Sequence, residues 1–181
     1  MSKRWLYGGL LLTLIVALSG GSYALAKNDD NGVAKARLNG YNEVVGPGSI
    51  STVGRGKFSA RIDKSGQKIT YKLTYTLENP ATVAHLHFAQ QHVGGGIIAF
   101  LCGGGGKPAC PSPGGTVEGT ITPADIVGPD GQGIEAGSFA EAVRAIRAGA
   151  VYANVHSTRW PAGVIRGQLS GGKDDHGRGH K

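Results

Sequence analysis

Residues 68–79 read Lys-Ile-Thr-Tyr-Lys-Leu-Thr-Tyr-Thr-Leu-Glu-Asn, and polar and apolar side chains alternate without a break from Lys68 to Leu77. Successive side chains of a β-strand point to opposite faces, so the apolar residues share one face and the polar residues share the other. One buried face and one solvated face are typical of an antiparallel sheet. The stretch therefore predicts an antiparallel strand with its apolar face in a core.

Shorter strand patterns surround this stretch and are separated by glycine, proline and asparagine. They cover residues 33–44, 55–63, 84–88, 97–101, 116–122, 150–157 and 164–169. The apolar run at 97–101 predicts a strand buried on both sides. Roughly eight short strands with turn signals between them predict an all-β fold, an antiparallel Greek-key β-sandwich or flattened barrel.

One helix is expected within this β pattern. Ser138-Phe-Ala-Glu141 has the spacing of a capping box, in which the serine and glutamate side chains bond each other's backbone N–H groups. Phe139, Val143 and Ile146 then form one apolar stripe, and Gly149 is a residue suited to the helix end. The pattern predicts one short helix that packs against a sheet edge.

The two ends of the chain differ from the middle. Residues 1–26 have a basic start, an apolar run and small residues up to Ala26, the pattern of a signal peptide cleaved after Ala26. A retained anchor is the alternative, but the run from Leu6 to Leu18 is short for a span of about 20 residues. Residues 27–32 and 171–181 are expected to be a disordered leader and tail around one domain, 33–170. We expect a secreted or otherwise extracytoplasmic protein without stable membrane insertion after signal removal.

The chain of 181 residues has a formal net charge of +7, and +5 remains without residues 1–26, which hold two basic and no acidic residues. The basic residues are not interleaved with aromatic ones, so we expect no nucleic-acid binding. Loose affinity for anionic surfaces stays open.

Cys102 and Cys110 are the two cysteines of the chain. An oxidising compartment favours a disulfide between them, and the alternative is a soft metal site. Neither cysteine has a second cysteine or a histidine at the spacing of a zinc finger. The disulfide is therefore the preferred interpretation.

Ala84-His-Leu-His-Phe88 places His85 and His87 on the same face of a strand, opposite an apolar face. The strand at 151–157 repeats the pattern, with Tyr152, Asn154 and His156 on its polar face. If the two strands are neighbours, His85, His87 and His156 can bind one metal ion, copper or zinc. The alternative is three histidines that hydrogen-bond one another or the backbone and fix strand packing.

Other residues are assigned around such an ion. Asn154, Tyr152 and Arg166 are the expected second layer, and His92 is a candidate fourth ligand. The sequence offers no Ser-His-Asp arrangement, phosphate loop or apolar carboxylate pair. Catalysis would therefore require the metal, and we assign no catalytic residue.

Several motifs share an order with a known family. They are LNGYNEV at 38–44, AHLH at 84–87, IRAG at 146–149, VYANVHS at 151–157 and PAGVIRGQL at 161–169. In this order the chain, from about Val33 to Ser170, resembles the CHRD family, named from the animal protein chordin and found in many exported bacterial proteins. The family usually has an acidic residue where Val164 stands, which implies that an ion pair or ligand at that place is absent. The resemblance implies no catalytic residues.

The expected function is an exported CHRD-domain protein that acts as a non-catalytic binding or structural module, with the histidine metal site left open. Its expected partner is a protein or an envelope or extracellular component. The alternative is a copper-dependent redox protein using His85, His87 and His156, by analogy with copper–zinc superoxide dismutase, a sandwich that also uses a His-x-His strand. A third class, binding of polyanions or envelope surfaces through net charge, predicts strong salt dependence.

Overall fold

The computed structural model describes residues 32–44 and 48–170. The expected signal peptide at 1–26, nearly all of the leader and the tail at 171–181 lie outside the described residues. Within the described ranges, no helix is long and apolar enough to cross a membrane.

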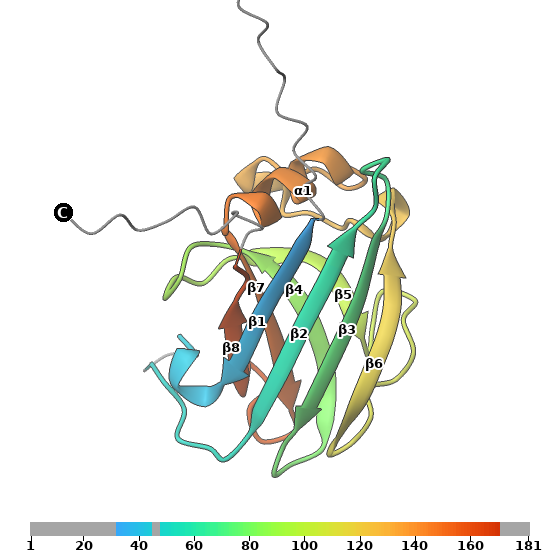
Figure 1. The fold of residues 1–181 in the computed structure, drawn as a ribbon. Coiled ribbons are helices and arrows are strands. Elements are labelled where there is room, and N and C mark those ends of the chain that lie inside the picture. The colour runs from blue at the N-terminus through green and yellow to red at the C-terminus, as the bar shows by residue number, and fades with distance from the viewer. Residues whose placement is uncertain (1–31, 45–47, 171–181) are drawn as a thin grey trace, which may run out of the picture.

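The described residues form eight antiparallel strands in one sheet that curls into a nearly closed barrel (Figure 1). The sheet order is β5-β4-β7-β8-β1-β2-β3-β6, so β5 and β6 are its two edges. The strand bounds are β1 Val33–Asn39, β2 Arg55–Ile62, β3 Ile69–Thr76, β4 Ala81–Phe88, β5 Gly96–Cys102, β6 Gly114–Ile121, β7 Val151–Ser157 and β8 Ile165–Gln168. The predicted all-β, flattened-barrel class is confirmed.

Strand β3 has the alternation that its sequence predicts. Ile69, Tyr71 and Leu73 are buried, and the polar residues between them are exposed. β3 pairs with β2 on one side and with β6 on the other, so every alternate side chain reaches the barrel interior. The Tyr71 hydroxyl donates to the Leu101 carbonyl at 2.7 Å, which ties β3 to β5 across the core.

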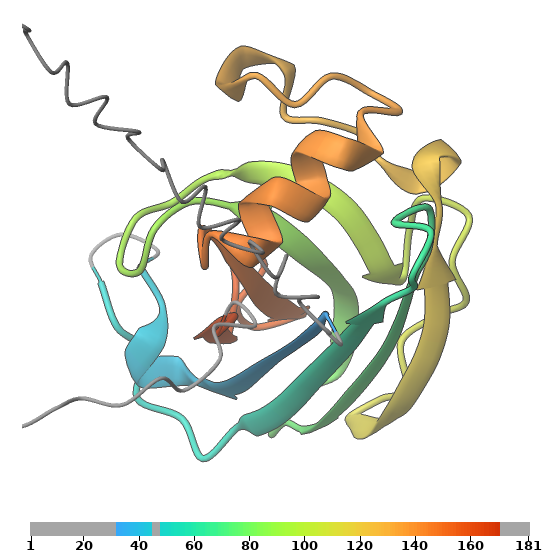
Figure 2. The ribbon, with the colours of Figure 1, turned by 45° about the horizontal axis from the view of Figure 1, so that its top comes forward.

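Helix α1, Phe139–Arg147, lies across one end of the barrel rather than along a sheet edge (Figure 2). Its predicted apolar stripe is confirmed, because Phe139, Val143 and Ile146 are buried in the core. The predicted capping box is wrong. The Ser138 backbone is not extended, with ψ near 69°, and its side chain caps no helical N–H. Glu141 instead pairs with Arg144 at 2.9 Å.

Strand β5 differs in part from its prediction. Ile98, Ala99 and Leu101 are buried, but Ile97 and Phe100 are only partly covered because β5 is an edge strand. The sulfur atoms of Cys102 and Cys110 lie at disulfide-bond distance, with their Cα atoms 5.0 Å apart. The pair therefore closes the loop that follows this edge strand.

Candidate metal centre

The outer wall of the barrel at β4, β7 and β8 carries polar side chains that are nevertheless buried. Strands β4 and β7 are neighbours, with His85 opposite Asn154 and His87 opposite Tyr152. Ala84 and Leu86 point into the core, so His85 and His87, which alternate with them along β4, point outward. The exposed fractions of His85, His87 and His156 are only 6%, 8% and 8%. Loops beyond the strands therefore cover this face.

The three predicted histidines converge. One ring nitrogen from each of His85, His87 and His156 lies within 4.8 Å of the others. His85 Nδ1 and His156 Nε2 are 3.1 Å apart. In the tetrahedral geometry of zinc, two imidazole nitrogens bound at about 2.0–2.1 Å lie about 3.3–3.4 Å apart. A pair at the 4.8 Å limit therefore has to close by about 1.4 Å to share one ion.

Backbone carbonyls decide which ring nitrogens carry protons. His87 Nδ1 lies 3.0 Å from the Gly95 carbonyl, and His156 Nδ1 lies 2.9 Å from the Pro161 carbonyl. A carbonyl only accepts, so both Nδ1 atoms donate, and both neutral rings keep a lone pair on Nε2. His87 Nε2 is buried and has no hydrogen-bond partner among the described residues. A second ring nitrogen bonded to a backbone carbonyl is the usual arrangement of a metal-bound histidine.

Without a bound ion, His85 donates a hydrogen bond to His156. Since His156 Nε2 has no proton, the 3.1 Å contact requires His85 Nδ1 to donate to it. The other tautomer of His85 would free Nδ1 to bind a metal ion together with the two Nε2 atoms. The ring of Phe100, from strand β5, packs against the His85 ring, with centroids 4.6 Å apart and an interplanar angle of 79°.

Burial keeps all three imidazoles neutral. Desolvation, with smaller contributions from His156 and His87, lowers the pKa of His85 to about 3. Desolvation also lowers the pKa of His87 to about 4, against the opposing hydrogen bond from the ring to Gly95. The pKa of His156 is lowered by burial as well. At neutral pH the lone pairs are therefore available, which is the state that metal binding requires.

A stack of planar groups extends from the histidines. The Tyr152 ring is parallel to the His87 ring, with centroids 4.7 Å apart. On Tyr152 lies the Arg166 guanidinium, 3.3 Å from the ring centroid. Arg166 is 2% exposed and donates to the backbone carbonyls of Gln90 and Val93 at 3.1 and 2.7 Å. Tyr152 thus lies against His87, Arg166 lies on Tyr152, and Arg166 also holds the loop after β4.

Glu43 is a buried carboxyl that the sequence analysis did not single out. It is 3% exposed and accepts a short hydrogen bond from the Asn154 side chain, which also donates to the Ile165 carbonyl at 3.1 Å. Burial raises the pKa of Glu43 to about 7, against the opposing charge of Arg166 and the bond from Asn154. Asn154 therefore binds Glu43 and the β8 backbone, not a histidine as its predicted role would need.

The local fold explains why Glu43 was missed. Residues 33–44 read as one loosely alternating strand, but β1 ends at Asn39 and the 3₁₀ turn Gly40–Asn42 follows. The Asn39 side chain accepts from the Asn42 backbone N–H at 3.0 Å, which redirects the chain and turns Glu43 inward. A Cβ on Gly163, where φ is +134°, would lie within about 3 Å of Glu43 and Asn154, so glycine leaves room for the pair. The only sequence signal was the position of Glu43 within the motif at 38–44.

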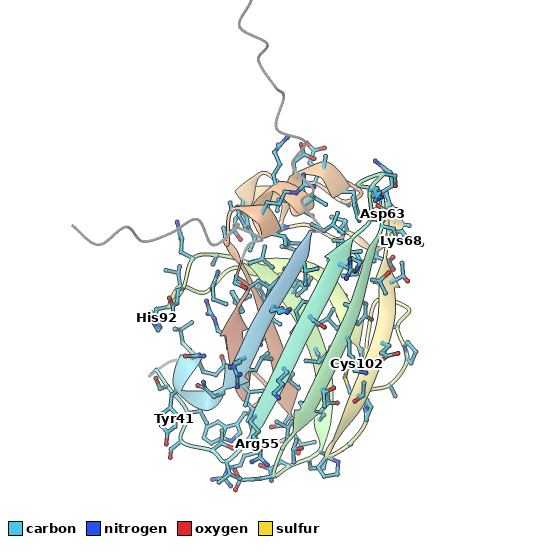
Figure 3. All side chains as sticks on the ribbon, viewed as in Figure 1. Tyr41, Arg55, Asp63, Lys68, His92 and Cys102 are labelled. Atoms are coloured by element: carbon cyan, nitrogen blue, oxygen red, sulfur yellow. A yellow bond between two sulfur atoms is a disulfide. The ribbon has the colours of Figure 1, made fainter. Side chains whose placement is uncertain are left out.

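His92 does not join the cluster. It is exposed in the loop after β4, has a positive φ of 63° and lies at the outer edge of the molecule (Figure 3). Its assignment as a fourth ligand is wrong, because the loop turns its side chain to solvent instead of over β4. Val164 is buried.

Acidification should destabilise the metal-free chain through these histidines. Their folded-state pKa values lie below the unfolded value of 6.5, so the unfolded state binds protons first as pH falls. Their stabilising contribution is complete above about pH 6.5 and is lost as pH falls toward 4 and 3, by up to about 1.4 kcal/mol per pH unit for each histidine. Glu43 has the opposite effect between pH 4.5 and about pH 7, because its raised pKa lets the folded state bind a proton before the unfolded state does. Urea unfolding with a chelator present, from pH 7.5 to 4.5, should therefore show net loss of stability below pH 6.5.

Two variants separate these opposing contributions. Glu43→Gln should steepen the loss of stability on acidification, because it removes a carboxyl that binds a proton in the folded state before it does so in the unfolded state. His87→Gln should reduce the slope of unfolding free energy against pH by the contribution of up to one bound proton, about 1.4 kcal/mol per pH unit. Equal slopes in all three proteins would contradict the assignment of these groups.

A model of the CHRD domain family matches residues 34–169, which is most of the chain. No curated protein and no solved structure is significantly similar to the chain. The match spans all eight strands except the first residue of β1, together with the three histidines, Glu43 and Arg166. The chain belongs to the CHRD domain family.

Proposed function

We propose that this CHRD domain is an exported, non-catalytic binding module that holds one transition-metal ion, zinc or copper, through His85, His87 and His156. The observation that carries the proposal is the state of the ring nitrogens. His87 and His156 bond backbone carbonyls through Nδ1 and present Nε2 to the cluster, and His87 Nε2 has no other partner in the described structure. Export rests on the signal-peptide pattern of residues 1–26, and the Cys102–Cys110 pair suits an oxidising compartment.

The hydrogen-bonding alternative explains less of this geometry. A buried polar atom without a partner costs about 1–3 kcal/mol, and His87 Nε2 is such an atom. A packing role alone also does not explain why three imidazoles lie together, since His156 and His87 both lower the pKa of His85. One bound cation satisfies His87 Nε2 and needs the neutral rings that burial maintains.

The copper-dependent redox alternative uses the same three histidines. Copper suits imidazole ligands, and three ligands leave a coordination position for a small substrate. The ligands are, however, at most 8% exposed, and Phe100 and Tyr152 lie directly against them. Because this cover restricts access of an oxidant to the ion, we infer binding rather than turnover. The partner of the module is inferred to be a protein or envelope component outside the cytoplasm.

Metal titration tests the proposal. The chain from Lys27, purified without an affinity tag, is titrated with zinc and, separately, with copper, and its metal content is measured. We expect one ion per chain and a thermal midpoint that rises with free metal, corresponding to about 2.7 kcal/mol at 100 times Kd. A chelator should reverse the shift.

The tail supplies the control, because it contains His176 and His180. A chain ending at Ser170 should keep the stoichiometric ion. Absence of stoichiometric binding, or binding that disappears with residues 171–181, would contradict the proposal. Superoxide dismutase activity that depends on copper loading would replace the binding module with the redox alternative.

A further inference from the structure

Basic side chains gather on the outer face of strands β1, β2 and β3. This basic face consists of Lys35 and Arg37 from β1, Arg55, Lys57 and Arg61 from β2, and Lys72 from β3. All of these residues are exposed. The face is the part of the barrel wall toward the viewer in Figures 1 and 3, with the labelled Arg55 near one end. Net charge that looks dispersed along the sequence is thus concentrated on one surface.

The pairing of strands places like charges against each other. Arg37 lies directly opposite Lys57, and like charges in such positions destabilise a sheet. Strands β1, β2 and β3 contain no acidic residue to compensate them. Glu118 of β6 pairs with Lys72 at 2.7 Å, at the rim of the face. The arrangement is therefore unfavourable for the isolated fold and becomes favourable when an anion lies across β1 and β2.

The surface between these cations is hollowed and carries hydroxyl groups. An open depression of about 710 Å³ is lined by Lys35, Arg37, Lys57 and Lys72, together with Ser59 and Thr74. A second depression of about 640 Å³ continues past Arg61 and Thr70. Hydroxyl groups alternate with cations here: Lys35 faces Ser59, Ser59 faces Lys72, and Lys57 faces Thr74. The face offers both ion pairing and hydrogen bonding.

We propose that the basic face binds a linear polysaccharide that carries carboxylate or sulfate groups. Neighbouring strands are about 4.8 Å apart and alternate residues about 6.5–7 Å apart, so cations and hydroxyls form a grid that a repeating anionic chain can follow. The hydroxyls of Ser59, Thr70 and Thr74 match the hydroxyls of sugar rings. This inference does not depend on the histidine cluster, which lies on the neighbouring part of the barrel wall at β4, β7 and β8.

Other polyanions fit the face less well. Binding of single-stranded nucleic acid uses aromatic side chains on which bases stack, but Tyr71 and Tyr75 point into the core. Insertion into an anionic membrane needs exposed apolar side chains beside the basic ones. The large apolar residues that are exposed in the described structure, Tyr41, Val53, Val93 and Val127, all lie outside β1, β2 and β3.

The test compares two charge-matched double variants of the chain from Lys27. Arg37→Gln/Lys57→Gln removes the opposed pair, and Arg144→Gln/Arg159→Gln removes two exposed cations elsewhere. Heparin and polygalacturonate are the sulfated and carboxylated probes, and dextran is the neutral control. We expect the first variant to weaken binding of the charged probes at least about tenfold at low salt. The slope of log affinity against log salt concentration should fall by the equivalent of about two ionic contacts. The second variant should bind nearly as the parent does.

Each further outcome decides against the proposal. Equal losses in the two double variants would show that net charge alone attracts the probes. Binding that disappears when residues 171–181 are removed would assign it to the basic tail. Tighter binding of double-stranded DNA, or of vesicles containing phosphatidylglycerol, would replace the polysaccharide with another class of partner. The thermal midpoint should stay close to that of the parent in Arg144→Gln/Arg159→Gln and should be equal or slightly higher in Arg37→Gln/Lys57→Gln, because all four residues are exposed and the latter change also removes two opposed like charges.

Discussion

His87→Ala is expected to weaken zinc binding by at least about 100-fold, since the loss of partners outside the coordination sphere alone changes metal affinity by about 10- to 100-fold. His87 is the most informative ligand to remove. Its Nε2 is buried and has no hydrogen-bond partner among the described residues, so its lone pair is free to bind an ion. Calorimetric titration of the chain from Lys27 measures the loss, and His85→Ala and His156→Ala should show similar losses.

Controls separate ligand loss from damage to packing. His87→Phe keeps an aromatic ring against Tyr152 but removes both nitrogens, so it should lose the ion with a smaller change in metal-free stability. His92→Ala removes a histidine from an exposed loop and should leave affinity unchanged. Retained zinc affinity in His87→Phe, or a comparable loss in His92→Ala, would exclude a site at the histidine cluster.

Arg166→Met should lower the free energy of unfolding by about 3 kcal/mol or more, because Arg166 donates two hydrogen bonds and a hydrogen bond to a charged group contributes about 1.5–3 kcal/mol. The Arg166 guanidinium is the nearby positive charge that lowers the pKa of buried Glu43, and it also donates to the carbonyls of Gln90 and Val93. Its removal leaves the carboxyl without an opposing charge and both carbonyls without this donor. Methionine keeps most of the volume against Tyr152, so the loss measures the charge and hydrogen bonds more than a cavity.

Two comparisons test whether the loss of stability in Arg166→Met comes from the buried guanidinium. Arg159→Met removes an exposed arginine that lies over Trp160, 5.4 Å from the ring centroid, and should cost less than about 1 kcal/mol. Glu43→Gln combined with Arg166→Met should recover part of the stability, because the amide carries no buried charge. Urea unfolding at pH 7.5 measures all four proteins. An Arg166→Met loss no larger than that of Arg159→Met would show that the buried guanidinium contributes little.

Local periodicity accounts for the features that were predictable from the sequence. The alternation from Lys68 to Leu77 predicted β3 and its buried face because the side-chain period of a strand is a local property. The same argument placed His85 and His87 together on the polar face of β4, and Tyr152, Asn154 and His156 together on that of β7. Helix α1 followed from its apolar stripe, although its start was wrongly ascribed to a capping box.

Pairing between distant segments decided the rest, because contacts between residues far apart in the chain follow from strand order and loop paths rather than from spacing. Placing β7 beside β4 brought His156 to His85 across 71 residues. The turn after β1 carried Glu43 to Asn154 across 111 residues, and no local pattern marks that encounter. Sheet order likewise collected Lys35, Arg37 and Lys57 into one face. The spacing of residues along a strand fixes which side of that strand is polar, and the pairing of strands fixes which polar sides meet and which remain in solvent.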